Sequence, residues 1–155
     1  MVFDFEERSG DLFQCISPTD SVIVGISGDM KLSNKAFKPD VGSKLSMLQA
    51  HKKPVGQVLS LPDGQRHIFF LVTRQRSYNT PSISSLQMCL KELRDICEKQ
   101  GISNLAISKD LEAGLEEKHL KEILFTVFSG WPGKLVMFYA ATDNSATKKK
   151  VPAIM

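Results

Sequence analysis

The sequence predicts an α/β fold of three layers, with helices on both faces of a mixed sheet, and three observations lead to that prediction. Residues 21–27 are β-branched and apolar, which is typical of a strand buried on both faces. Residues 81–100 carry one apolar stripe at helical spacing. Strand and helix patterns then alternate toward the C-terminus, and parallel strands joined by helices need helical layers on both sides of the sheet.

Short apolar segments separated by turn signals make up the first half of the chain. Pro62-Asp63-Gly64 is a hairpin signal between two of these segments. The expected elements are a strand at 2–6, a strand at 21–27, a loop with one helical turn at most at 28–42, a short helix at 43–51, and a hairpin of strands at 57–61 and 66–73.

Longer periodic segments make up the second half. The helix at 81–100 is expected to begin with Thr80 as its N-cap and Pro81 in its first turn, and to end at Gly101. The remaining expected elements are a strand at 104–108, a helix at 116–129 and a strand at 134–140. Open parallel sheets bind ligands beyond the carboxyl ends of their strands, so the loops after Ser27, Thr73, Ser108 and Ala140 are candidates for a site.

Length and composition favour one domain at 1–140, with a C-terminal tail at 141–155 that is expected to be flexible. No apolar stretch approaches the roughly 20 residues of a membrane span, so no membrane contact is expected. The N-terminus lacks the pattern of a signal peptide, which indicates an intracellular protein of the nucleus or cytoplasm. Three sparse cysteines without a CxxC pair predict neither a disulfide scaffold nor a metal site.

The tail contains the dense basic run Lys148-Lys149-Lys150 in a chain of formal net charge +3. Such runs are most often solvated, and the alternative is a weak contact with phosphate or nucleic acid.

Four segments, in this order, carry a resemblance to a known family. They are Gly10-Asp11-Leu12-Phe13, residues 21–27, residues 68–76 with the following Pro81 and Leu86, and Gly114-Leu115-Glu116. Together they resemble the macrodomain family, in the branch of terminal ADP-ribose protein glycohydrolases. The resemblance implies a macrodomain-like sheet and ADP-ribose or an ADP-ribosylated protein as the partner. No cofactor and no metal is expected, since the histidines and cysteines are too scattered for a metal site.

The resemblance also implies roles for individual residues. Asp11 would accept a hydrogen bond from the adenine amino group, with a backbone contact from Leu12, although an aspartate after glycine is also a common turn residue. Backbone N–H groups of the second ligand loop, residues 108–116, would wrap the diphosphate. The implied ligand-binding residues are Asp11, Leu12, Ile26, Ser27, Ser33, Ser108, Lys109, Ala113, Gly114, Leu115 and Tyr139.

Both ligand loops depart from the family pattern. The first is glycine-rich in this branch, whereas residues 31–36 contain no glycine. The second has the pattern Gly-x-Gly-Leu-Asp in the family and reads Glu112-Ala113-Gly114-Leu115-Glu116 here. Asp110 and Glu112 are therefore expected to bring negative charge to the place of the diphosphate, unless their carboxylates point away.

The catalytic positions of the family fall on Arg74, in place of a lysine, and on Glu116, in place of an aspartate. Glu116 keeps a carboxylate that can act as a base, whereas arginine stays charged and is not a nucleophile. The leading hypothesis is a divergent macrodomain that binds ADP-ribose or a related nucleotide with weak or absent hydrolysis. The alternatives are an active ADP-ribosyl-glutamate hydrolase and a non-catalytic interaction module whose pocket is closed.

Overall fold

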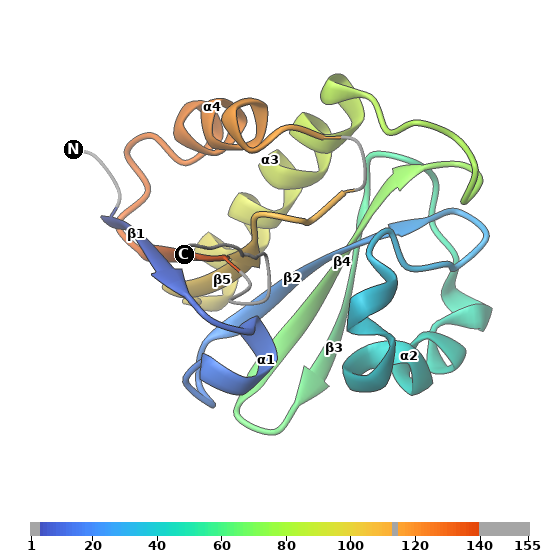
Figure 1. Ribbon diagram of the computed structural model, residues 1–155, viewed down its shortest axis with the longest axis horizontal. Helices are drawn as coiled ribbons and strands as arrows, with labels where there is room; N and C mark the ends of the chain where they lie inside the picture. Colours follow the sequence, from blue (N-terminus) through green and yellow to red (C-terminus); the bar gives the residue numbers. More distant parts are fainter. Residues whose placement is uncertain (1–3, 113–114, 140–155) are drawn as a thin grey trace, which may run out of the picture.

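The fold is built on one mixed six-stranded sheet, seen here in a computed structural model that describes residues 4–112 and 115–139 (Figure 1). The strands are β1 (Asp4–Ser9), β2 (Ser21–Ser27), β3 (Val58–Asp63), β4 (Arg66–Arg74), β5 (Asn104–Ser108) and β6 (Lys134–Tyr139). The helices are α1 (Leu12–Cys15), α2 (Lys38–Met47), α3 (Ile83–Gln100) and α4 (Glu117–Val127), with 3-10 turns at Lys35–Phe37 and Gln49–His51.

The sheet order is β1-β6-β5-β2-β4-β3. Only β3 runs antiparallel to its neighbour β4; the other pairs among the described strands are parallel. The carboxyl ends of β1, β2, β4, β5 and β6 therefore lie along one edge of the sheet, and this edge carries the loops in which the sequence places the ligand.

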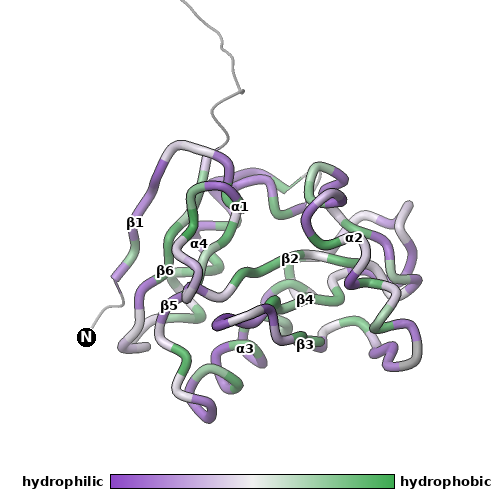
Figure 2. The backbone as a smooth tube through the Cα atoms, turned by 90° about the horizontal axis from the view of Figure 1, so that it is seen from below, coloured by the Kyte–Doolittle hydropathy of each residue, from purple (hydrophilic) through white to green (hydrophobic). Residues whose placement is uncertain are grey.

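Two apolar layers pack on opposite faces of the sheet, which confirms the predicted three-layer α/β/α class. Alternate side chains of each strand point to opposite faces, so neighbours in β4 divide between the layers: Phe69 packs under α3 and α4, and Phe70 under α1 and α2. All seven residues of β2 are buried, as expected for a central strand covered on both sides. Figure 2 shows hydrophobic residues concentrated along β2 and β4.

Several element boundaries differ from the sequence prediction. Helix α3 is capped by Ser82, whose side chain accepts a hydrogen bond from the Ser85 N–H, and not by Thr80. Ser82 lies two residues after the predicted cap Thr80, and its hydroxyl oxygen is the one that accepts from a backbone N–H of the first turn, so Pro81 lies outside the helix. The helix ends as predicted, at Gly101 with φ of 69°.

The segment at 28–42 is more helical than predicted. Helix α2 already begins at Lys38, with Pro39 in its first turn. The backbone N–H groups of the first turn have no partner within the helix, so the N–H that proline lacks is not missed there. The strand β1 extends to Ser9 instead of ending at residue 6, because it follows its partner β6 residue by residue. Strand β3 extends to Asp63, which leaves only Gly64 and Gln65 in the hairpin turn.

Among the described residues no helix is long and apolar enough to cross a membrane. The same residues contain no cluster of three histidine, cysteine or acidic side chains that could hold a metal ion. Cys89 and Cys97 are buried under α3, as predicted, and burial raises the pKa of both thiols to about 12.

Candidate functional site

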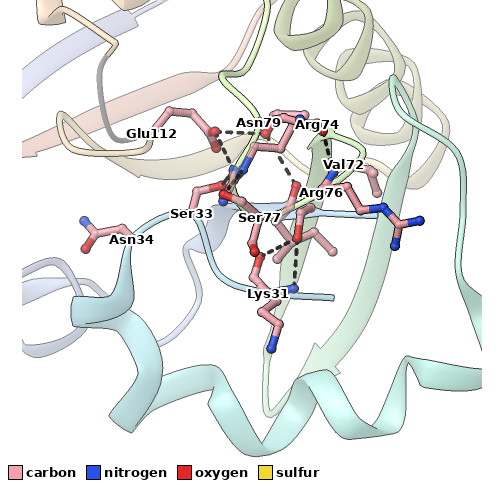
Figure 3. Close-up of polar contacts among 12 residues, drawn as sticks. Lys31, Ser33, Asn34, Val72, Arg74, Arg76, Ser77, Asn79 and Glu112 are labelled. Carbon is pink, nitrogen blue, oxygen red and sulfur yellow. Dashed lines mark hydrogen bonds and ion pairs between the residues drawn. The ribbon is translucent and has the colours of Figure 1, made fainter. Parts of the chain in front are cut away.

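Arg74 ends β4 at the ligand edge of the sheet, yet its side chain is only 7% exposed. Its Nη1 donates to Glu112 Oε1 at 3.0 Å and also to the hydroxyl of Ser33, while Nε donates to the backbone oxygen of Ser77 at 3.2 Å (Figure 3). Its partners come from the loop after β2, the loop after β5 and the segment after β4. One guanidinium therefore ties together the loops that surround the candidate site.

Glu112, in the loop after β5, supplies the carboxylate of this buried ion pair. Its side chain is fully buried, and Oε1 also accepts a hydrogen bond from Thr73 Oγ1 at 2.9 Å. Oε2 has no hydrogen-bond partner among the described residues. Burial raises the pKa of the Glu112 carboxyl, and the hydrogen bonds and the charge of Arg74 oppose that rise.

The sequence left open whether the Glu112 carboxylate faces a diphosphate or points away from it. The carboxylate points into the protein, because a buried cation in β4 and a gap in β2 receive it. The gap is Gly25: a Cβ on this residue would collide with Glu112 Oε2 and lie 2.9 Å from Ser33 Oγ. Asp110, by contrast, is half-exposed and pairs with Lys109 at 3.3 Å.

A cavity of about 330 Å³ lies over Arg74 and is called the Arg74 cavity below. Of the three guanidinium nitrogens, Nη2 is the one that donates to no described residue. Lys31 and Lys35 form no ion pair with the described residues, so the cavity is lined by positive charge. Its lining residues are Lys31, Leu32, Ser33, Lys35, Arg74, Ser77, Tyr78, Asn79 and Pro81.

The first ligand loop, residues 31–36, contains no glycine and is held in place by hydrogen bonds of Asn34. Asn34 donates from Nδ2 to the backbone oxygen of Asp110 at 2.8 Å and accepts from the Ala36 N–H at 3.0 Å. This bond joins the loop after β2 to the loop after β5. The two loops are therefore fixed relative to one another, and Ser33 of the first loop lines the Arg74 cavity.

Asp11 lies at the start of α1 with an exposed side chain. One carboxylate oxygen, Oδ1, accepts a hydrogen bond from the Phe13 N–H at 2.9 Å and so caps the helix. The other oxygen, Oδ2, bonds to no described residue and is free to accept from a ligand. Leu12 next to it is buried in the core layer under α1 and α2.

Other predicted residues hold the loops in shape. Ser27 donates to Asp29 and accepts from the Lys31 N–H at 3.2 Å, and Ser108 accepts from the Asp110 N–H at 3.0 Å. Ile26 is buried, and its backbone oxygen faces the hydroxyl of Thr73. Ala113 and Gly114 lie outside the described residues, as do Lys148, Lys149 and Lys150.

Tyr139 and Leu115 do not contribute to the hydrogen bonds of Arg74 or to the lining of the Arg74 cavity. The Tyr139 hydroxyl donates to the carboxylates of Glu7 and Glu117, and Lys121 bridges the same two carboxylates at 2.9 and 3.0 Å. These bonds lower the pKa of both carboxyls, and they join β1, β6 and α4. Leu115 is half-buried against the layer under α3 and α4.

Glu116 is the N-cap residue of α4, and its side chain makes no capping hydrogen bond. The carboxylate is 75% exposed and lies 3.6 Å from His119 Nδ1. The resemblance implies a pairing of the roles of Arg74 and Glu116, but the carboxylate bound to Arg74 is that of Glu112.

Sequence patterns did not single out Gly25 or Thr73 as residues of the site, and they left the direction of the Glu112 side chain open. A glycine in the middle of a β-branched strand was a usable signal, since it marks a close approach by another group. Which group approaches depends on the path of a loop more than 80 residues later in the chain.

Comparisons with known proteins give relatives in sequence and in fold. No protein-family model matches the chain. Its sequence is 28% identical over 135 residues to the ADP-ribose glycohydrolase OARD1 of Homo sapiens and 27% identical to that of Bos taurus. Each match spans 83% of this chain and 87% of the relative.

Solved structures show the same architecture at lower sequence identity. The macrodomain of Thermus aquaticus DarG superposes with a TM-score of 0.73 at 14% identity, over 88% of this chain and 98% of that one. Thermosipho africanus DarTG in complex with ADP-ribose gives a TM-score of 0.63 at 17% identity, over 92% of this chain and 42% of that one. This chain is therefore a macrodomain in fold, similar in sequence to ADP-ribose glycohydrolases.

Proposed function

We propose that this macrodomain binds ADP-ribose, free or attached to a protein, at the carboxyl edge of the sheet, and that it does not remove the group through a lysine. The observation that carries the proposal is Arg74 itself. A permanently charged guanidinium stands where the resemblance implies an attacking amine, and Glu112 holds it in a buried ion pair.

The charge of the Arg74 cavity supports an anionic ligand. Arg74, Lys31 and Lys35 line the cavity, and Nη2 of Arg74 donates to no described residue. Neither lysine forms an ion pair with the described residues, although the charge of Lys31 acts on Asp29. A diphosphate can receive charge-assisted hydrogen bonds from such groups in place of the backbone N–H groups of a glycine-rich loop. The volume, about 330 Å³, is at the lower end of the range of small-molecule pockets.

Asp11 supports the same ligand at a second point. Its oxygen Oδ2 is exposed and unpartnered among the described residues, while Oδ1 fixes the carboxylate by capping α1. A carboxylate held in one orientation is suited to accept a hydrogen bond from an adenine amino group. The related ADP-ribose glycohydrolases and the ADP-ribose complex of a protein of the same fold add to this support.

Arg74 contributes binding and no covalent chemistry in this proposal. A sugar–enzyme bond needs a nucleophile with a free electron pair, which a guanidinium does not offer at physiological pH. Glu116 is the one predicted catalytic group that stays exposed, and it does not cap its helix. Hydrolysis with Glu116 as the base is the alternative, since an exposed carboxylate can activate water.

Calorimetric titration with ADP-ribose tests the binding proposal. We expect saturable heat with the wild type and weaker binding by Asp11→Ala and by Lys31→Ala/Lys35→Ala. Lys91→Ala/Lys99→Ala, which removes two exposed charges from α3, is the matched control and should bind as the wild type does. Saturating ligand without heat, or full affinity in Asp11→Ala, would remove the proposal in favour of an interaction module.

An ADP-ribosylated protein in a release assay separates binding from hydrolysis. We expect no release above background by the wild type. Release that disappears in Glu116→Gln would establish the alternative, in which Glu116 is the base. Release that survives this substitution would contradict both mechanisms.

A further inference from the structure

A second pocket, with a volume of about 500 Å³, lies beside the Arg74 cavity and is called the Lys52 pocket. The segment after β4 separates the two. Arg74 and Ser77 line the Arg74 cavity, whereas Gln75 and Arg76 line the Lys52 pocket. Figure 3 shows the Arg76 side chain directed away from the Arg74–Glu112 pair. The residues that line the Lys52 pocket are Gly28, Asp29, Lys52, Lys53, Pro54, Val55, Gln75 and Arg76.

The lining of this pocket is positive, with Lys52, Lys53 and Arg76 against the single carboxylate of Asp29. Lys53 is held in place, because its Nζ donates to the backbone oxygen of Val58 at 3.0 Å. The side chains of Lys52 and Arg76 are exposed and form no hydrogen bond or ion pair with the described residues. Two cations therefore remain free to bind an external anion.

Asp29 can offset only one of these three positive charges. Its Oδ1 accepts from the Ser27 hydroxyl and its Oδ2 from the Ser77 N–H at 3.4 Å. The bond from Ser27, then that from the backbone, favours the charged carboxylate and holds the pKa of Asp29 below its usual range. Lys52, Lys53 and Arg76 keep an excess of positive charge over it.

We propose that the Lys52 pocket binds an acidic protein segment through carboxylate side chains. Its cations come from separate segments, at 52–53 and at 76, and Pro54 and Val55 add apolar surface to the same lining, so the pocket suits carboxylates spaced along a chain better than one compact ion. None of the lining residues is aromatic, whereas sites for single-stranded nucleic acid combine positive charge with aromatic stacking surfaces.

The Lys52 pocket is a neighbour of the Arg74 cavity, so both could be occupied by one partner protein. An acidic segment held there lies next to the Arg74 cavity, because Arg74 and Ser77 line that cavity and the residues between them, Gln75 and Arg76, line the Lys52 pocket. If the ligand in the Arg74 cavity is attached to another protein, acidic residues of that protein would bind in the Lys52 pocket at the same time. The binding itself does not depend on the proposed function, since it is tested without ADP-ribose.

Fluorescence anisotropy with a labelled peptide of alternating glutamate and glycine tests the inference at low and physiological salt. We expect binding that weakens with salt and that falls about tenfold or more in Lys52→Ala/Arg76→Ala. Lys91→Ala/Lys99→Ala removes the same number of exposed charges away from the pocket and should bind like the wild type. Circular dichroism of both variants verifies the fold.

Three results would overturn the inference. They are no binding of the peptide at low salt, equal loss in both variants, and tighter binding of an oligothymidylate of the same charge. ADP-ribose titrated into Lys52→Ala/Arg76→Ala keeps the two proposals apart. Its affinity should match that of the wild type, and failure of ADP-ribose to bind any variant would count against the proposed function alone.

Discussion

The carboxylate of Glu112 lies directly over the α-carbon of Gly25, in the space that a side chain at position 25 would fill. Strand β2 and the loop after β5 can therefore pack this closely only because residue 25 has no Cβ. The same carboxylate binds Arg74, so the fit also decides how a cation stands at the floor of the Arg74 cavity.

The first prediction concerns this fit. Gly25→Ala should destabilise the protein by about 1–3 kcal/mol, because it overpacks a closed interior. In a Glu112→Ala background the same substitution should cost less, since the colliding oxygen is gone. Urea unfolding of the four proteins of this cycle measures the coupling. Gly42→Ala is the control: its nearest neighbour is the flexible Lys38 side chain, and alanine favours the helix α2. Equal costs of Gly25→Ala in both backgrounds would contradict the fit.

A second prediction concerns the buried charge. Glu112→Ala should destabilise the protein by about 3–5 kcal/mol, because it leaves the guanidinium of Arg74 buried without its carboxylate. Asp110→Ala removes a half-exposed carboxylate from the same loop and should cost at most about 1 kcal/mol. Chemical denaturation of the two variants gives the comparison, and similar losses would show that the Arg74–Glu112 pair is not buried.

The third prediction is a dependence of stability on pH. Burial raises the pKa of Glu112 above its ordinary value, so the folded protein holds this proton more tightly than the unfolded chain. The contribution of Glu112 to the free energy of unfolding therefore falls as the pH rises from the unfolded pKa, near 4.5, through the folded value, and is constant above it. The difference in stability between wild type and Glu112→Gln should decrease across this window, and a rise would contradict the direction.

A fourth prediction concerns the missing lysine. Arg74→Lys alone should release ADP-ribose from a modified protein only slowly, because Glu112 would keep the new ammonium charged and paired. Adding Glu112→Ala removes this carboxylate and lowers the pKa of the lysine. Each unit of that shift raises the fraction of neutral amine about tenfold. The release rate of the double variant should therefore exceed that of Arg74→Lys by about tenfold or more; a faster single variant would show that Glu112 does not restrain residue 74.

A fifth prediction concerns the edge of the sheet. Tyr139→Phe removes the hydroxyl that donates to Glu7 and Glu117, and should cost about 1 kcal/mol, since both carboxylates are partly exposed. Tyr78→Phe is the matched control, because Tyr78 is 82% exposed and bonds to no described residue. Thermal unfolding compares the two, and equal midpoints would contradict the role of Tyr139.

The sequence by itself determined the architecture of this protein. Residues 21–27 and 66–73 are apolar and β-branched, and the stripe of α3 recurs at helical spacing, so the central strands and the long helix follow from local patterns. The layers follow from these elements, since parallel strands need crossovers that cover the sheet. Boundaries such as the cap of α3 differed by two residues because neighbouring hydroxyl groups compete for the same backbone donors.

Only the tertiary structure decided what stands at the floor of the site. Residues 25 and 33 are far along the chain from residues 74 and 112, and nothing local tells whether a glutamate in a loop turns outward to a ligand or inward to an arginine. That choice depends on the cost of burying a charge against the gain of pairing it, and both depend on distances set by the packed sheet. In this protein the gap at Gly25 and the charge of Arg74 turn Glu112 inward.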